Sequence, residues 1–400
     1  MRLTGHKLSS LRKMCLMNYF ISISLYFPIE VAYLNSLGFS GIQITMINLC
    51  LPLFIGILEI PTGHLGDIKS RKTIMVYAIL SFILSLVILL SFRNFFMIFI
   101  AYFLEGLGWS LASGNNDALL KDVMNSDVEG FNKGLSKFYE FSFLATLSSS
   151  ILLVTMTSLG YDDFKLLLVI TLIIRVLALV FGLSVTAQNR KQEDCKKHVL
   201  SISEATKKYI KNKTTIAIAV YEGIGRFQFF FPTIYQIVLI VNGFPIKYIA
   251  YINFGYVVLQ YFIQKYSQRI IKAFTRKQLL YILPLIQSLL MLSVFTDNIF
   301  ILSISIILIY ACIPLKTQIA NEYKHIYIDD YNRSTYISIV SFIALTFSTI
   351  AFFIVGITFN FSNFLGKVVF IALIVFFSLI TVKRIVVLDS KFDELKDEKS

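Results

Sequence analysis

Apolar stretches recur along the chain and are separated by short polar and basic segments. A helix of about 20 apolar residues crosses the hydrocarbon layer of a bilayer, so this pattern predicts membrane-spanning helices. Twelve such spans are expected, near 14–34, 42–62, 73–92, 95–113, 137–159, 164–186, 214–241, 248–266, 278–295, 299–319, 336–358 and 364–382. The sequence therefore predicts an all-α membrane protein.

The longest hydrophilic stretch, 187–213, divides these spans into six and six. Two bundles are expected, at 1–186 and 214–382, joined by this linker and followed by a tail at 383–400. Within the linker, Ser201 and Glu204 have the spacing of a helix capping box. A short helix on the inner membrane surface and a flexible solvated linker are both compatible with that stretch.

Composition supports the membrane interpretation and accounts for the positive charge. Hydrophobic residues make up 56% of the 400 residues, mean hydropathy is +0.72 and the net charge is +13. Most of the 37 Lys and Arg residues lie before the first span, in the even-numbered loops or in the tail. By the positive-inside rule, both termini and the linker face the cytoplasm of a cell membrane. Charge that sets topology needs no nucleic acid as a partner, and none is expected.

The segment 59–72 reads Glu-Ile-Pro-Thr-Gly-His-Leu-Gly-Asp-Ile-Lys-Ser-Arg-Lys. It resembles the signature of the major facilitator superfamily, G-x-x-x-D-R/K-x-G-R-R/K, which lies between spans 2 and 3. The matching residues are Gly63, Asp67, Arg71 and Lys72. Ile68 and Ser70 depart from the pattern.

The resemblance implies the major facilitator fold, with twelve transmembrane helices in two six-helix bundles, and a monomeric transporter working by alternating access. It also implies that Asp67 braces span 2 against the start of span 11, which would follow Arg333 and close the cytoplasmic side. We accordingly expect Gly63, Asp67, Arg71, Lys72 and Arg333 to form a conformational switch. A basic loop that merely fixes topology is the alternative.

A second resemblance, to bacterial drug-efflux-like members, is carried by segments 105–114 and 117–120 and by Arg333-Ser-Thr with Ser338. Two features depart from proton-coupled exporters. Tyr102 stands near the place of their fourth-span arginine, and three serines at 148–150 replace the glycine-proline motif of their fifth span.

Charged residues inside the predicted spans are candidates for function, because each costs at least about 2.5 to 3.5 kcal/mol at the bilayer centre. We expect a substrate and proton cavity lined by Glu30, Glu105, Trp109, Arg175, Glu222 and Arg226. Glu105 is the first choice for a protonatable group, since no basic residue shares its helix within two turns. Arg175 as a static partner of Glu105, mutual pairing of Glu222 and Arg226, and simple packing of Trp109 are the alternatives.

These features predict a secondary active transporter that exports a small amphiphilic or cationic compound, with proton coupling as one possibility. The alternatives are a nutrient uptake symporter on the same fold, or a sensor or immunity protein that no longer transports. Small-molecule substrate, lipid and protons are the expected partners. The chain has neither a phosphate-binding loop nor an HExxH motif, and its cysteines are scattered, so no enzyme activity, cofactor or metal is expected.

Overall fold

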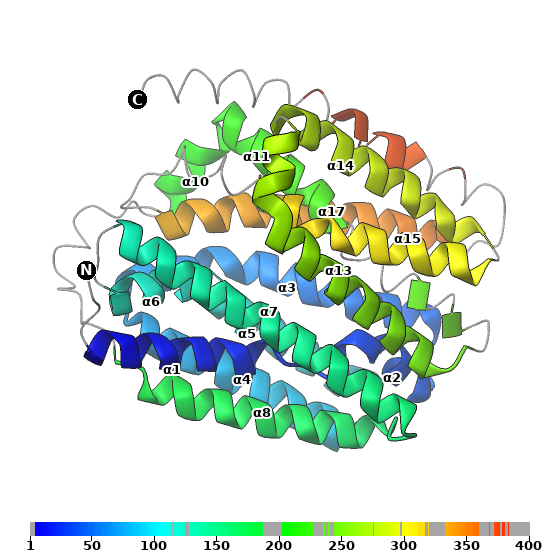
Figure 1. Cartoon of the computed structure of the whole chain (residues 1–400), viewed down its shortest axis with the longest axis horizontal. Coiled ribbons are helices and arrows are strands. Elements are labelled where there is room, and N and C mark those ends of the chain that lie inside the picture. The colour runs from blue at the N-terminus through cyan, green and yellow to red at the C-terminus, as the bar shows by residue number, and fades with distance from the viewer. Residues whose placement is uncertain are drawn as a thin grey trace. The chain divides into compact units, whose positions relative to one another are not determined.

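The computed structural model describes residues 5–113, 115–124, 128–186, 202–227, 235–236, 239–240, 244–274, 276–296, 298–316, 319, 333–359, 368, 372–376, 378–380 and 383 (Figure 1). Helices are the only regular secondary structure in this part of the chain. Seven of the described helices are long and apolar enough to cross a membrane, and three shorter apolar helices accompany them. The twelfth predicted span and the tail lie largely outside the described residues.

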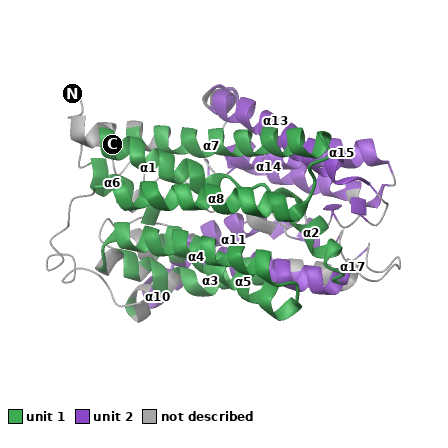
Figure 2. Ribbon diagram, turned by 90° about the horizontal axis from the view of Figure 1, so that it is seen from below, with its two compact units in different colours: residues 1–39, 50–205, 330–338 green, residues 40–49, 206–329, 339–400 purple. Residues whose placement is uncertain are grey.

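The chain forms two compact units, coloured separately in Figure 2. The first unit comprises 1–39, 50–205 and 330–338, and the second comprises 40–49, 206–329 and 339–400. Both units are therefore built from segments that are discontinuous in the sequence.

The first unit is a bundle of helices around an apolar core. The helices are α1 (Gly5–Ser22), η1 (Phe27–Ile29), α2 (Glu30–Ser36), α3 (Gly41–Ile68), α4 (Arg71–Ser91), α5 (Phe95–Ala112), α6 (Asn115–Met124), α7 (Val128–Ser158) and α8 (Phe164–Ser184), with the start of α3 assigned to the second unit. α4 packs against α5 and α8, and α1 packs against α7 and α8 (Figure 1). Side chains such as Met14, Met17, Ile79 and Phe82 fill the core between them. Asn94 and Asp163 cap α5 and α8 by accepting hydrogen bonds from backbone N–H groups of the first turn.

The signature segment is more helical than the sequence predicts. A loop is expected at 63–72, but α3 continues to Ile68, so that only Lys69 and Ser70 separate it from α4. Pro52 and Pro61 lie inside α3 without ending it. The carbonyls at a helix C-terminus have no intrahelical donors, and Arg71 supplies one with its Nε atom, 3.3 Å from the Gly66 carbonyl.

The second unit contains α11 (Lys213–Phe227), α13 (Ile246–Ala273), α14 (Arg276–Met291), η3 (Leu292–Phe295), α15 (Ile299–Ala311) and most of α17 (Arg333–Phe359). α13 and α14 both pack against α15. Before α11, part of the linker forms α10 (Ile202–Ile210). Of the two alternatives compatible with the sequence, a short helix and a flexible linker, this part is helical. Residues 187–201, including Ser201 of the capping box, lie outside the described part.

The predicted tenth span is interrupted near its end. α15 ends at Ala311, and helix resumes at 313–316 around Pro314. Proline has no N–H group with which to bond the carbonyl four residues earlier. Gln260 of α13 donates its Nε2 to that Tyr310 carbonyl at 2.8 Å, and Gln287 of α14 donates to the Ile309 carbonyl at 3.0 Å. Side-chain amides from two neighbouring helices therefore replace backbone donors at the break.

Candidate functional site

The first span is also interrupted, at residues 23–26, where the sequence predicts one span over 14–34. Neighbouring helices supply the missing hydrogen bonds. The N–H of Leu25 donates to the Thr171 hydroxyl of α8 at 3.2 Å, and the Ser149 hydroxyl of α7 donates to the Ser24 carbonyl at 2.7 Å. Irregular backbone at membrane depth is tolerated only with such partners, and interrupted helices often form the binding sites of transporters.

Glu30 begins α2 directly after this interruption, and it is buried. The Tyr102 hydroxyl of α5 donates a hydrogen bond to its Oε2 atom at 3.1 Å. A carboxylate without a basic partner within its span is expensive in an apolar surrounding, and this hydrogen bond compensates only part of the cost. Glu30 is therefore a buried carboxylate whose described side-chain hydrogen bond comes from Tyr102.

Glu105 lies on α5, one turn from Tyr102, and is only 6% exposed. Trp109 lies one turn further, on the same face, as the sequence predicts. Its indole Nε1 donates to Glu105 Oε1 at 3.1 Å, while 37% of the tryptophan residue stays exposed. The only tryptophan of the chain is thus directly bonded to the carboxylate that the sequence marks as protonatable.

Arg175 enters the same region from α8, one turn after Thr171, and is only 3% exposed. Its Nε and Nη1 atoms are buried and have no hydrogen-bond partner. The ring of Phe82 lies 4.9 Å from its Cζ atom and packs edge-on against Trp109, with 5.2 Å between ring centroids. Gly108 makes room for this ring, because a Cβ atom there would lie 2.5 Å from it.

We refer to Glu30, Tyr102, Glu105, Trp109 and Arg175 as the polar cluster. Glu105 and Arg175 interact electrostatically, but their side-chain nitrogen and oxygen atoms are more than 4.0 Å apart. These two described residues therefore do not form an ion pair. The cluster combines two carboxylates with one permanently charged guanidinium. Such a set can exchange protons, bind a cation at the carboxylates and bind an acceptor group at the guanidinium. Nowhere among the described residues do three His, Cys, Asp or Glu side chains gather to hold a metal ion.

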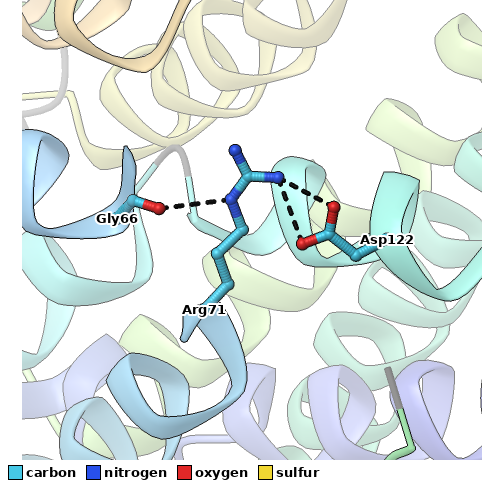
Figure 3. A network of polar contacts seen from close by, with 3 residues as sticks. All are labelled: Gly66, Arg71 and Asp122. Carbon is cyan, nitrogen blue, oxygen red and sulfur yellow. Dashed lines mark hydrogen bonds and ion pairs between the residues drawn. The ribbon is translucent and has the colours of Figure 1, made fainter. Parts of the chain in front are cut away.

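A second polar network lies at the signature segment, shown in Figure 3. Arg71 Nη1 lies 3.0 Å from Oδ1 and 3.2 Å from Oδ2 of Asp122 on α6, while its Nε bonds the Gly66 carbonyl. The two charged side chains are only 9% and 11% exposed. Arg71 therefore ties the end of α3 and the start of α4 to α6.

The sequence matches the family described as the Major Facilitator Superfamily over residues 14–317, which is most of the chain. The chain belongs to this superfamily. Two solved structures of the nucleoside transporter NupG support the same fold. The structure of a NupG variant has a TM-score of 0.68 at 10% identity, and the match covers 96% of this chain and 98% of the NupG chain. The other structure has a TM-score of 0.65 at 11% identity, and the match covers 97% of this chain and 99% of the NupG chain. No curated protein sequence matches the chain.

Membership of the superfamily confirms the predicted fold class. The protein is a multi-pass membrane transporter and not an enzyme. The described residues do not allow all twelve helices of the fold to be counted.

The structure brings together four of the six cavity residues predicted from the sequence. Glu30, Glu105, Trp109 and Arg175 all lie in the first unit, whereas Glu222 lies on α11 in the second unit, half-buried. The side chain of Arg226 lies outside the described residues, so its pairing with Glu222 stays a prediction.

Of the predicted conformational switch, the structure describes three side-chain positions. Gly63 is buried in α3, Lys72 is half-buried at the start of α4, and Arg71 forms the network with Asp122. The side chains of Asp67 and Arg333 lie outside the described residues, and their contact remains an expectation from the superfamily resemblance.

The second unit contains a buried cation of its own. Lys316 follows the break in the tenth span and is 4% exposed, and its Nζ atom has no hydrogen-bond partner. It lies 5.2 Å from the ring centroid of Tyr221, the neighbour of Glu222 on α11. The sequence places this lysine within a span but does not indicate a role for it.

Three contributors to these networks are not among the residues predicted from the sequence. Asp122 belongs to no recognised motif and lies in a segment expected to be a loop, so nothing in the sequence connects it with Arg71. Phe82 is one of many apolar residues in its span. Thr171 does leave a signal, because a hydroxyl residue four positions before Arg175 must lie on the same helix face.

Proposed function

We propose that the chain is a secondary active transporter that exports a small amphiphilic or cationic compound by alternating access, driven by proton entry. The observation that carries this proposal is the polar cluster, in which two buried carboxylates share the interior of one bundle with a single guanidinium. The acidic excess favours a cationic ligand, and the exposed face of Trp109 offers a surface on which a cation or a flat ring stacks.

The proton acts at the polar cluster in this proposal. When Glu105 is ionised, it accepts the Trp109 hydrogen bond, attracts Arg175 and can hold a cationic solute. When it takes up a proton, it loses its attraction for the cation, which then leaves. Proton binding and solute binding at one carboxylate therefore exclude each other, which is the requirement for exchange of the two across the membrane.

The test uses full-length protein in liposomes, after fluorescent dyes, antibiotics and amines have been screened for altered accumulation in cells that express it. An imposed pH gradient should drive transport by the native protein. Glu105→Gln should abolish gradient-driven transport while exchange of solute down its own gradient survives. Glu140→Gln, an exposed carboxylate of α7 outside the cluster, is the matched control and should leave transport unchanged.

A static role for Glu105 predicts a different outcome. If Arg175 needs Glu105 only as a counter-charge, Glu105→Gln should lower thermal stability, corresponding to about 3 to 5 kcal/mol for a stranded buried charge. Replacing both residues by Gln should then restore stability. Normal gradient-driven transport by a stable Glu105→Gln protein would refute both versions and direct attention to Glu30 and Glu222.

Uptake of a nutrient is the second candidate, because both similar structures are of a nucleoside transporter. At 10% and 11% identity this likeness supports the fold and only suggests the substrate. Labelled nucleosides offered to intact cells and to inverted vesicles distinguish the two candidates. Accumulation in intact cells favours uptake, whereas accumulation of amines in inverted vesicles favours export.

A further inference from the structure

Arg175 is the least satisfied charged group of the polar cluster. A guanidinium stays protonated in proteins and carries five N–H donors in a planar fork that matches the two oxygens of a carboxylate. Here the Nε and Nη1 donors are buried without an acceptor, and an aromatic ring, Phe82, lies against the group. Buried donors normally have partners, so their absence at a residue that is 3% exposed calls for a ligand.

One oxygen of each carboxylate in the cluster accepts a hydrogen bond from a residue other than Arg175. Glu105 Oε1 accepts from Trp109 on its own helix, and Glu30 Oε2 accepts from Tyr102. Glu30, Glu105 and Arg175 are all described in the structure, and neither carboxylate forms an ion pair with Arg175. The acceptor that would satisfy Arg175 must therefore come from outside this arrangement.

A series of side-chain contacts surrounds the guanidinium. Phe82 connects Arg175 to Trp109, and Trp109 is bonded to Glu105, so a cation, two aromatic rings and a carboxylate follow one another across three helices. A ligand along this series would meet a donor fork at one end and a carboxylate at the other. The partly exposed ring of Trp109, beside Glu105, suits an apolar or aromatic part of the same ligand.

We infer that the transported solute is amphoteric, with an anionic group bound by Arg175, a cationic group bound by Glu105 and an apolar or aromatic part that stacks on Trp109. This inference rests on the proposed function, since it takes the polar cluster as the transport site. It narrows the substrate class from amphiphilic or cationic compounds to those that also carry a carboxylate or an equivalent acceptor.

The chain contains its own reporter for this inference, because its single tryptophan is Trp109. Emission of the purified full-length protein would be titrated with phenylalanine, with phenethylamine, which lacks the carboxylate, and with 3-phenylpropanoate, which lacks the amine. Phenylalanine should shift the emission at a concentration at least tenfold lower than either of the others. Equal midpoints for phenylalanine and phenethylamine, or no response to any of the three, would overturn the inference.

Variants of Arg175 decide whether the guanidinium produces the preference. Arg175→Gln should remove the tenfold advantage of phenylalanine and leave the phenethylamine midpoint unchanged. Arg93→Gln, at an exposed arginine between α4 and α5, is the matched control and should retain the advantage. Arg175→Lys keeps the charge but loses the planar fork, so it should retain only part of the advantage and serves if the Gln variant does not fold. An undiminished advantage in either Arg175 variant would contradict the inference.

The outcome is separable from that of the proposed function. A preference for phenylalanine that depends on Arg175, together with transport by the native protein that does not respond to an imposed pH gradient, would refute proton coupling and leave the amphoteric site standing. Gradient-driven transport of simple amines that is unchanged in Arg175→Gln would refute the amphoteric site and leave the proposal of proton coupling intact.

Discussion

The losses of stability on replacing Arg71 and Asp122 should not be additive, because the two side chains form one ion pair in the first unit. At an effective dielectric constant of about 20, unit charges 3.0 Å apart attract by roughly 5 kcal/mol, most of which offsets the desolvation of two side chains that are 9% and 11% exposed. Removing one partner leaves the other charge without this buried counter-charge, so Arg71→Gln or Asp122→Asn should each cost about 3 kcal/mol, the low end for buried pairs.

The double variant Arg71→Gln/Asp122→Asn should also cost about 3 kcal/mol, because the pair is lost only once, and this gives a coupling of about 3 kcal/mol between the two sites. Thermal unfolding of the purified protein measures these differences, with each single variant melting on the order of 10 °C below the native protein. Lys121→Gln, the exposed neighbour of Asp122, is the control and should melt with the native protein. Additive losses, with the double variant near about 6 kcal/mol, would refute the reasoning, since independent sites add.

Two further predictions concern packing and the break in the tenth span. Gly108→Ala should displace Phe82 and lower the melting temperature, with a red or blue shift of the tryptophan emission, whereas Gly41→Ala, at an open position, should change neither. Gln260→Leu should leave the carbonyl at the tenth-span break without its donor and cost about 1 to 3 kcal/mol in thermal unfolding, whereas Gln264→Leu, at an exposed position one turn later, should be nearly neutral.

The helices could be predicted well from the sequence because each apolar stretch has to match the thickness of a bilayer, a requirement local to that stretch. The breaks could not. Prolines 52 and 61 leave α3 continuous, whereas the first span opens before Pro28 and the tenth opens at Pro314. The interruption in the first span has a donor and an acceptor on neighbouring helices, Ser149 and Thr171, which lie more than a hundred residues away in the chain.

The candidate site shows the same division. The cost of a charge in an apolar span is enough to single out Glu30, Glu105 and Arg175, since that cost depends on the residue and its span alone. The spacing of four residues also places Trp109 beside Glu105. That Arg175 meets Phe82 instead of a carboxylate depends on how three helices pack, which the periodicity of a single sequence does not specify.

The interrupted first span has a consequence for how the protein is made. Its backbone at Leu25 is satisfied by a hydroxyl 146 residues later, and that at Ser24 by one 125 residues later. A ribosome adding about 5 to 20 residues per second needs roughly 7 to 30 s to reach Thr171 after Leu25 has been joined to the chain. Until then the interruption in this span lacks its partners on α7 and α8, so the span cannot reach its native form before the later helices have been made. The first unit is therefore complete only when this span has acquired its partners. In a truncated chain that stops before α8, the N–H of Leu25 should lack its native acceptor.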